Sequence, residues 1–197
     1  YREASCTTVW NFSTDTVVAN ITLYAKWYKH YGLGSIGPAG GYVFYDKGSY
    51  SDGWRYMEAV HESKEGVSRI WGGYGTIVSG TEEAVGTGEA NTSKIITKYG
   101  NAEPSESSTD YAAKLCTDAV LNNGGVNYDD WFLPSIEELD QMYLNLYEKG
   151  IGGFSDKGYW SSTEFSNNNA RIFGFNLRSK GQGPKSNSQS VRAIRTF

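Results

Sequence analysis

Few side chains of this chain combine the types and the spacing that catalysis or metal binding requires. The two cysteines, Cys6 and Cys116, are too few for a disulfide framework or a four-ligand zinc site, and they stand far apart in the sequence. The two histidines, His30 and His61, belong to no metal-binding spacing such as H-E-x-x-H. These residues predict neither a cofactor nor a metal centre, and they leave open whether the cysteines form a structural bridge.

Three short polar sequences could carry chemistry, and each has a simpler interpretation. Asp129-Asp130 could ligate calcium, but no D-x-D-x-D-G pattern surrounds the pair, so we expect a cap or a salt bridge there. The hydroxyls of the SST sequence at 161–163 lack a nearby histidine base and are expected to bind backbone groups at a strand end. The GTG sequence at 86–88 lacks the lysine of a phosphate loop and indicates the start of a helix. We therefore expect a protein without catalytic activity.

The segment 165–190 stands out by its composition. Five of its 26 residues are serine, five are asparagine and three are glycine, while sequences rich in aromatic and β-branched residues flank it on both sides. A surface of small polar side chains held between stiff strands suits ligand binding better than catalysis. The simpler alternative, which composition alone favours, is an ordinary polar loop.

Length and composition indicate one folded domain with a small appendage. Of the 197 residues, 39% are hydrophobic and 20% are charged, which is typical of a globular chain. The aromatic fraction of 15% and the 24 glycines favour a fold rich in strands and turns. A net charge of −4 gives no basic surface for nucleic acid, and no apolar run is long enough to span a membrane.

The N-terminal residues are predicted to form a separate unit. Residues 8–27 have the alternation of a strand, a turn at 13–15 and a second strand. Glycine and proline then accumulate over 28–38, which is typical of a linker. We therefore expect an N-terminal hairpin in 1–30 and the main domain in 31–197.

Strands are expected at both ends of the main domain. A strand at 41–45 and its partner at 54–59 should form a hairpin with a longer loop. Three more strands are predicted at 158–162, 171–178 and 191–196. With helices between these two groups, the predicted class is α+β with mixed antiparallel sheets.

Helices are predicted over 91–98, 108–121 and 135–148, each ended by a glycine. The third is the best defined, because Ser135 and Glu138 have the spacing of a capping box. Apolar residues then follow at helical spacing and trace one stripe, which we interpret as part of the core.

Alternation within 171–178 divides the side chains of this strand between two faces. Phe173, Phe175 and Leu177 share one face, which we expect to lie in the core. An isoleucine beside an arginine on the opposite face would suit a binding surface, although single exposed apolar residues are normal. That opposite face carries Ile172, Gly174, Asn176 and Arg178.

Two arginines of the closing strand, Arg192 and Arg195, stand among apolar neighbours. A buried arginine is tolerated when a carboxylate binds it and is costly without one. We therefore expect both to bind carboxylates inside the fold and not to contact ligand.

Several separated sequence words resemble one known family. They are WFLPS at 131–135 followed by Glu138-Leu139, YWSSTE at 159–164 and the closing VRAIR at 191–195. In this order they resemble the Lcl C-terminal domain family over residues 37–197. The resemblance implies a C-type lectin-like fold of the formylglycine-generating enzyme subclass, used as a ligand-binding module on bacterial surfaces. The enzyme of that subclass works through a pair of cysteines, whereas no cysteine follows Cys116 here.

Within that family, a C-terminal region loaded with asparagine, serine and glycine resembles the variable proteins of diversity-generating retroelements, in particular the variable lipoproteins of treponemes. The resemblance implies that adenines in asparagine-type codons are randomised. Such codons cannot yield lysine or glutamine, so Lys180, Gln182, Lys185 and Gln189 are expected to be fixed. The ligand-binding residues are then expected to be Phe165, Ser166, Asn167, Asn168, Ile172, Gly174, Asn176, Arg178, Gly181, Gly183, Pro184, Ser186 and Ser188.

Two functions follow as expectations. The first is a surface-displayed protein whose diversified C-terminal face binds an unknown protein or glycan receptor. The second is an invariant adhesin of the same fold that binds glycans or glycosaminoglycans, with tryptophan and tyrosine faces stacking on the sugars. A near-copy of the coding stretch beside a reverse transcriptase would distinguish the first from the second.

Localisation is also implied by resemblance. The sequence at 10–27 resembles the closing part of a Listeria-Bacteroides repeat, a β-grasp-like module of bacterial surface proteins, so 1–30 would be a partial repeat. The chain starts at Tyr1 without Met or a signal-peptide pattern, so we expect a mature segment. The resemblance implies an outer-membrane lipoprotein whose anchor lies outside this chain. We expect a monomer, although some members of the family assemble as trimers.

Overall fold

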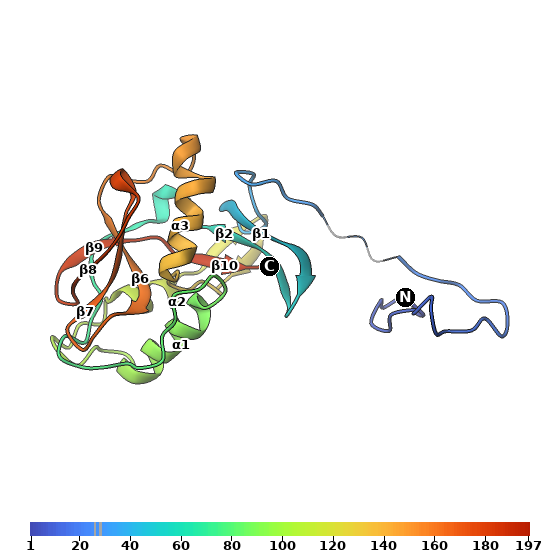
Figure 1. Ribbon diagram of the computed structural model, residues 1–197, viewed down its shortest axis with the longest axis horizontal. Coiled ribbons are helices and arrows are strands. Elements are labelled where there is room, and N and C mark those ends of the chain that lie inside the picture. The colour runs from blue at the N-terminus through green and yellow to red at the C-terminus, as the bar shows by residue number, and fades with distance from the viewer. Residues whose placement is uncertain (26, 28) are drawn as a thin grey trace. The chain divides into compact units, whose positions relative to one another are not determined.

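The computed structural model describes residues 1–25, 27 and 29–197 (Figure 1). Lys26 and Tyr28, which belong to the predicted second strand and linker, lie outside the described residues. Within the described part of the chain, no helix has the length and the apolar character needed to cross a bilayer.

The chain forms two compact units, Tyr1–His30 and Tyr31–Phe197. The division falls at the start of the glycine-rich stretch 28–38. Each unit is held by its own hydrogen bonds, and the second contains every helix and strand found among the described residues.

The first unit lacks the expected strands. No strand occurs among its described residues, so the prediction of a strand, a turn and a strand over 8–27 is wrong for them. A turn does form near the expected place, where the Asp15 N–H donates to Asn11 O at 2.8 Å. The Phe12 side chain is 84% exposed and that of Val18 is 92% exposed. An isolated hairpin is marginal in water, and these side chains have no sheet of their own unit to pack on.

The second unit is α+β, as predicted, with three sheets (Figure 1). The first has the strand order β1-β2-β10, formed by Tyr42–Ser51, Trp54–Ala59 and Ile194–Thr196. The second has the order β3-β9-β6-β7-β8, formed by Gly66–Ile70, Ser188–Val191, Gly158–Glu164, Asn169–Gly174 and Ser179–Pro184. The third pairs β4 (Leu121–Asn123) with β5 (Val126–Tyr128). Paired strands are antiparallel except β6 and β9, which are parallel.

Three α-helices accompany the sheets: α1 (Gly88–Tyr99), α2 (Ala112–Thr117) and α3 (Ile136–Asn145). Short 3-10 turns lie at η1 (Glu62–Lys64), η2 (Tyr147–Lys149) and η3 (Phe175–Leu177). Both α1 and α3 confirm the helices expected at 91–98 and 135–148, although α3 passes into η2 at its end. The second helix is much shorter than the expected 108–121, because the chain after α2 turns into strand β4.

The capping box at the start of α3 is confirmed. The Glu138 N–H donates to Ser135 Oγ at 3.2 Å, and the Ser135 N–H donates to Glu138 Oε2 at 2.7 Å. The apolar stripe of the helix, with Ile136, Leu139 and Met142, is buried. Helix α3 is thus fixed at its N-terminus and packs its apolar side on strands of both larger sheets.

The β1–β2 hairpin is confirmed, but its loop is short. Strand β1 continues to Ser51, which pairs with Trp54, so only Asp52 and Gly53 form the turn. Their φ values are +51° and +87°, the left-handed pair that two-residue hairpins favour. The turn residues that indicated a longer loop therefore lie within the strand.

The closing strand is split in two. Residues 191–196 do not form one strand, because β9 ends at Val191 and β10 starts at Ile194. Strand β9 belongs to the five-stranded sheet and β10 to the three-stranded sheet. Arg192 and Ala193 carry the chain from one sheet to the other, so Arg192 lies between the sheets, whereas Arg195 lies within β10.

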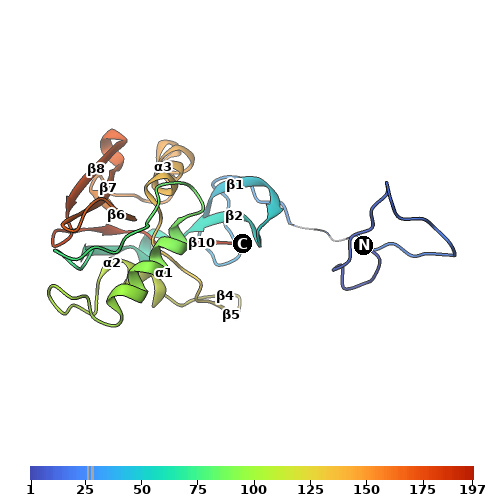
Figure 2. The same cartoon turned by 60° about the horizontal axis from the view of Figure 1, so that its bottom comes forward.

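The five-stranded sheet separates two buried clusters. Tyr159 and Phe173 lie in one cluster with the apolar side of α3, whereas Trp160 and Ala170 lie in the other with Trp71. Consecutive residues of β6 thus point to opposite faces, as strand geometry requires. Figure 2 shows β6, β7 and β8 side by side, with α3 next to them. The C-terminal segment is therefore built on a sheet that is packed on both faces near β6.

Candidate binding face

The asparagine-rich and serine-rich segment is folded and is not a simple loop. It runs from the end of β6 through a turn, β7, η3, β8 and a second turn into β9. Six residue pairs join β7 to β8, from Asn169 opposite Pro184 to Gly174 opposite Ser179. Strand β8 is an edge strand of the sheet, so one side of this hairpin is open.

A buried ion pair fixes the hairpin at one end. The Lys185 side chain is fully buried, and its Nζ lies 2.5 Å from Glu164 Oε1. The same Nζ donates to Thr76 O at 2.7 Å and lies 4.6 Å from the centre of the Trp71 ring. Burial lowers the pKa of Lys185, and the neighbouring Glu164 carboxylate opposes that shift. Lys185, which the retroelement resemblance places among the fixed positions, thus joins the variable segment to the rest of the fold.

The Glu164 carboxylate is itself held from a second direction. It accepts the N–H of Val78 at 2.9 Å and the N–H of Ser79 at 3.1 Å. The ion pair therefore also fixes the chain before α1 to the sheet. In the sequence, Glu164 stands out only as part of the YWSSTE word, and no local pattern indicates its partner Lys185, which lies in the turn after β8.

Aromatic packing fixes the hairpin at the other end. Phe173 and Phe175 are fully buried, with the ring of Phe175 4.6 Å from that of Phe154 and 4.8 Å from that of Tyr159. Leu177, which was expected in the core with them, is 77% exposed. The prediction fails for Leu177 because β7 ends at Gly174 and the 3-10 turn η3 replaces the two-residue alternation.

The same turn redirects Arg178. It was expected beside Ile172, but its backbone has a φ of +46° and its side chain turns to α3. Its Nε donates to Asp140 Oδ1 at 2.9 Å, and its guanidinium lies 5.5 Å from the centre of the Tyr143 ring. Burial alone would raise the pKa of Asp140, but hydrogen bonds from Arg178 and Lys180 lower it. Arg178 is thus exposed but held by the scaffold.

Ile172 is less exposed than expected. It is half-buried and packs at the edge of the cluster that contains Trp160. Gly183 is buried and lies against Ile172. A Cβ atom added to Gly183 would be only 2.6 Å from Ile172 Cδ1. Gly183, which was predicted to bind ligand, is therefore not exposed in this structure. Because Gly183 has no side chain, β8 can pass close to Ile172 at this position.

The turn between β6 and β7 has a fixed backbone, and only Phe165 and Asn167 of its residues are exposed. Ser166 Oγ accepts the N–H of Asn168 at 3.2 Å and that of Asn169 at 3.0 Å. The Asn168 carbonyl accepts the Lys185 N–H at 2.8 Å, which ties this turn to the next one. Phe165 is 49% exposed, and the Arg171 guanidinium lies 4.7 Å from its ring centre.

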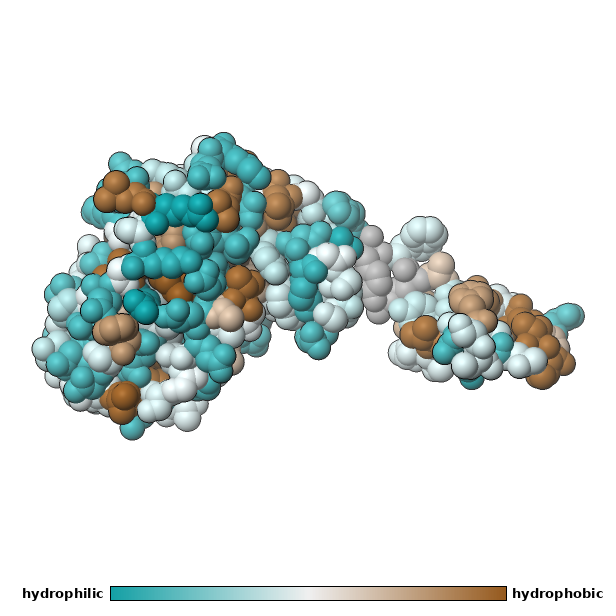
Figure 3. All heavy atoms as spheres, in the orientation of Figure 1, coloured by the Kyte–Doolittle hydropathy of each residue, from teal (hydrophilic) through white to brown (hydrophobic). Residues whose placement is uncertain are grey.

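The predicted ligand-binding residues therefore divide by exposure and do not form one uniform patch. They lie on the β7–β8 hairpin, on the turns at its two ends and, for Ser188, at the start of β9. Ser166, Asn168, Ile172 and Gly174 are half-buried, and Gly183 is buried. The face of the second unit seen in Figure 3 is largely hydrophilic, with apolar residues in separate small groups. The exposed members are Phe165, Asn167, Asn176, Arg178, Gly181, Pro184, Ser186 and Ser188.

Both closing arginines bind carboxylates, as expected. Arg192 is fully buried and forms an ion pair with Glu65, to which its Nε donates at 3.0 Å. Arg195 donates to Glu58 at 2.8 Å and to Asp130 at 2.6 Å. Burial raises the pKa of Glu58, and the hydrogen bond from Arg195 opposes that shift. Arg195 and Glu58 are neighbours on the paired strands β10 and β2, whereas Arg192 binds Glu65, the residue before β3. Asp130 has the salt-bridge role that was predicted.

The Glu138 carboxylate has two roles, of which the sequence indicated only one. Besides capping α3, Glu138 accepts the N–H of Gly86 at 2.8 Å and that of Gly88 at 3.3 Å. It is fully buried, and burial raises its pKa to about 7 although these hydrogen bonds oppose the shift. The GTG sequence indeed starts α1, as predicted, and Glu138 attaches it to α3. The capping-box spacing revealed Glu138, but the contact with 86–88 is tertiary.

The remaining candidates for catalysis or metal binding are the hydroxyls of 161–163 and the two cysteines. Ser161 Oγ donates to Arg171 O and Thr163 Oγ1 to Glu82 O, both at 3.0 Å, which confirms their predicted role. Cys6 and Cys116 are not bridged, and burial raises the pKa of the Cys116 thiol. Among the residues that the structure describes, no group of three His, Cys, Asp or Glu side chains could hold a metal ion.

Comparison with known proteins adds no family to these observations. No protein-family model matches the chain, and no curated protein matches it.

Proposed function

We propose that this chain is a non-catalytic ligand-binding protein of C-type lectin-like fold, which contacts its partner through the β7–β8 hairpin and the adjoining turns. The observation that carries the proposal is the division of one segment into two kinds of position. Phe173, Phe175 and Lys185 are fully buried, whereas residues between or next to them, such as Asn176, Gly181 and Ser186, are exposed. Small polar side chains on a fixed backbone are what adaptable binding surfaces use.

The held backbone gives such a surface a physical advantage. Binding is weakened when loops and side chains must be ordered on contact, so a hairpin fixed at both ends avoids part of that cost. The ion pair of Lys185 with Glu164 fixes one end, and the ring of Phe175 fixes the other. Exposed side chains can then change without a change in the path of the chain.

We further propose that a diversity-generating retroelement changes these exposed residues on a surface-displayed, lipid-anchored protein, whose partner is a protein or glycan receptor. The sequence words of the Lcl C-terminal domain family and the asparagine and serine content of 165–190 support this proposal. The burial of Lys185 and the ion pairs of Lys180 with Glu137 and Asp140 also support it, since both lysines are positions that the mechanism would leave unchanged.

Sequencing the 3′ end of the gene across isolates, together with its neighbourhood, tests the proposal. The expected result is substitution at Asn176, Gly181, Ser186 and Ser188, each at an adenine of a nearby template copy, with Lys185 unchanged. An unvarying stretch without a template would contradict diversification. It would favour the alternative, an invariant glycan-binding adhesin, and glycan-array screening would then identify its ligand.

A further inference from the structure

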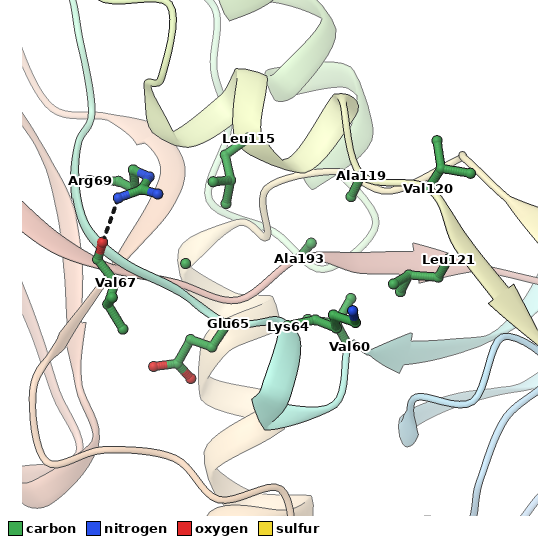
Figure 4. Close-up of a pocket in the computed structure, with 11 residues that line it drawn as sticks. Val60, Lys64, Glu65, Val67, Arg69, Leu115, Ala119, Val120, Leu121 and Ala193 are labelled. Atoms are coloured by element: carbon green, nitrogen blue, oxygen red, sulfur yellow. Dashed lines mark hydrogen bonds between the residues drawn. The ribbon is translucent and has the colours of Figure 1, made fainter.

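Three of the four outer strands of the two larger sheets bind a further segment of the chain. Strand β1 exchanges backbone hydrogen bonds with 34–35, and β10 exchanges them with Phe132. Strand β3 forms a bridge to Tyr111, and Figure 4 shows the cavity beside β3, where Leu115 extends from α2 towards the chain of this strand. Among the residues that the structure describes, no bridge and no backbone hydrogen bond occupies the outer side of the fourth strand, β8. An open sheet edge of this kind can pair with another chain.

The strand register determines which backbone groups of β8 point outward. The Lys185 N–H donates to Asn168 O at 2.8 Å, and residue pairs of an antiparallel ladder alternate between hydrogen-bonded and non-hydrogen-bonded. Counting back from Lys185 in steps of two, the two glycines of β8 bond to β7, so Lys180 and Gln182 direct their N–H and C=O groups to the open side. Pro184, which has no N–H, ends this row. The edge thus offers two donors and two acceptors at the spacing of an extended chain.

The lysine of this edge does not guard it. Edge lysines oppose the addition of a strand when their charge lies at the edge. The Lys180 ammonium instead lies 2.7 Å from Glu137 Oε2 and 3.2 Å from Asp140 Oδ2, and both carboxylates belong to α3. Figure 2 shows β8 at the outside of the sheet, with β7 and β6 on its inner side. The backbone of an incoming strand can therefore reach β8.

The other face of β8 has no side chains next to Ile172. Gly181 stands directly opposite Ile172, and the only atom near its Cβ position is the Ile172 carbonyl oxygen at 3.9 Å. The half-buried Ile172 side chain extends towards β8, because its Cδ1 would lie 2.6 Å from a Cβ atom at Gly183. An apolar side chain of an added strand can therefore pass over Gly181 and cover Ile172, which removes apolar surface from water.

We propose that β8 binds an extended segment of a partner protein, which joins the five-stranded sheet as a further strand. The backbone of this segment bonds to Lys180 and Gln182, and its side chain opposite Gly181 is apolar. In such complexes the main-chain hydrogen bonds give affinity and the alternate side chains give specificity. This mode of binding rests on the proposed function and deepens it, because it names the partner as an extended protein segment and not a glycan. A proline at 180 or 182 would remove a donor, and both are positions that the retroelement would leave unchanged.

NMR titration of the full chain tests the edge, with a capped seven-residue peptide that alternates threonine with valine between two terminal glutamates. We expect saturable shifts in β8 and slower amide hydrogen exchange at Lys180 and Gln182, whereas Gly181 and Gly183 already bond to β7 and should change little. Gln182→Pro should weaken peptide binding by about tenfold, because it removes one outward donor and no hydrogen bond to β7. Gln182→Ala keeps that donor and should bind the peptide like the unaltered chain.

Two N-methylated forms of the peptide give a second readout that needs no variant of the chain. With the valines on the side of Gly181, the threonine amides face β8 and the valine amides face water. Methylation of the threonine nitrogens should therefore abolish binding, and methylation of the valine nitrogens should leave it nearly unchanged.

Equal binding of the two methylated forms, exchange protection at another sheet edge, or no saturable shift at millimolar peptide would overturn the inference. Shifts at exposed residues such as Asn176 and Ser186, without protection at Lys180 and Gln182, would also overturn it while leaving the proposed function in place. An unvarying gene without a template copy would instead contradict diversification and leave the pairing of β8 with a peptide intact.

Discussion

Lys180 and Lys185 belong to the same short stretch of chain but have opposite environments. The Lys180 side chain is 37% exposed and bridges to Glu137 and Asp140 on the surface of α3, whereas Lys185 is fully buried against Glu164. Lys180 lies within β8, and Lys185 lies in the turn that follows it. A residue type alone therefore does not tell which positions of this segment hold the fold and which are open to a partner.

The same contrast recurs in two other pairs. Phe175 is fully buried, and Leu177 at the end of the same 3-10 turn is 77% exposed. Gly183 lies under Ile172, while Gly181 has no side chain near its Cβ position. The contacts, and not the composition, thus divide the segment into a scaffold and a changeable surface.

The largest effect is expected for the aromatic pair. Phe175→Ala should lower the free energy of unfolding by about 4 kcal/mol, because it removes a fully buried ring from a tightly packed cluster. Leu177→Ala should change it by less than about 0.5 kcal/mol, as expected for an exposed side chain. Urea unfolding of both variants measures the difference. Similar losses in the two would show that Leu177 belongs to the scaffold after all.

The second largest effect on the free energy of unfolding is expected for the lysine pair. Lys185→Met should cost about 3 kcal/mol, because it leaves the buried Glu164 carboxylate without its cation. Lys180→Met should cost less than about 1 kcal/mol, because it removes only partly exposed ion pairs. Chemical denaturation at neutral pH gives both values. If Lys185→Met were as mild as Lys180→Met, the buried pair could not be what fixes this end of the hairpin.

The glycine pair should give a smaller difference. Gly183→Ala should cost about 1 to 2 kcal/mol, since the new methyl group would overlap the end of Ile172 and force it to move. Gly181→Ala should stay within about 0.5 kcal/mol, because the only atom near its Cβ position is a carbonyl oxygen at 3.9 Å. Melting temperatures of the two variants would sharpen the comparison. Equal shifts would mean that β8 is held uniformly.

The smallest effects are expected in the exposed turns. Ser186→Asn and Asn176→Ser should each change the free energy of unfolding by less than about 0.5 kcal/mol. Neither position is buried, and their neighbours Lys185 and Phe175 keep the backbone in place. A loss above about 1 kcal/mol for either would place that residue in the scaffold.

Local patterns predicted α1, α3 and the strands β1, β2, β6 and β7 of the main domain, but not β3, β4, β5 and β8. The capping box of α3, the β1–β2 hairpin and the carboxylate partners of Arg192 and Arg195 follow from short-range spacing and from the cost of an unpaired buried charge. The N-terminal strands failed although their alternation was clear, because a strand also needs a partner sheet on which to bury its apolar side.

The binding face was predicted less completely, for a different physical reason. Two-residue alternation holds in β7 but ends at η3, and no local signal marks the point where the strand becomes a turn. Leu177 and Arg178 were misplaced for that reason. Gly183 and Glu164 take their roles from contacts with distant residues, which no sequence spacing reveals.

Two display libraries test the central claim most directly. One randomises Asn167, Asn176, Gly181, Ser186 and Ser188, and the other randomises Phe173, Phe175, Gly183 and Lys185; each is scored for protease resistance and selected for binding to one purified protein such as lysozyme. The account predicts that most clones of the first library stay folded and that some bind the target, while most clones of the second unfold. Equal unfolding in both libraries, or a folded first library that yields no binder, would contradict it.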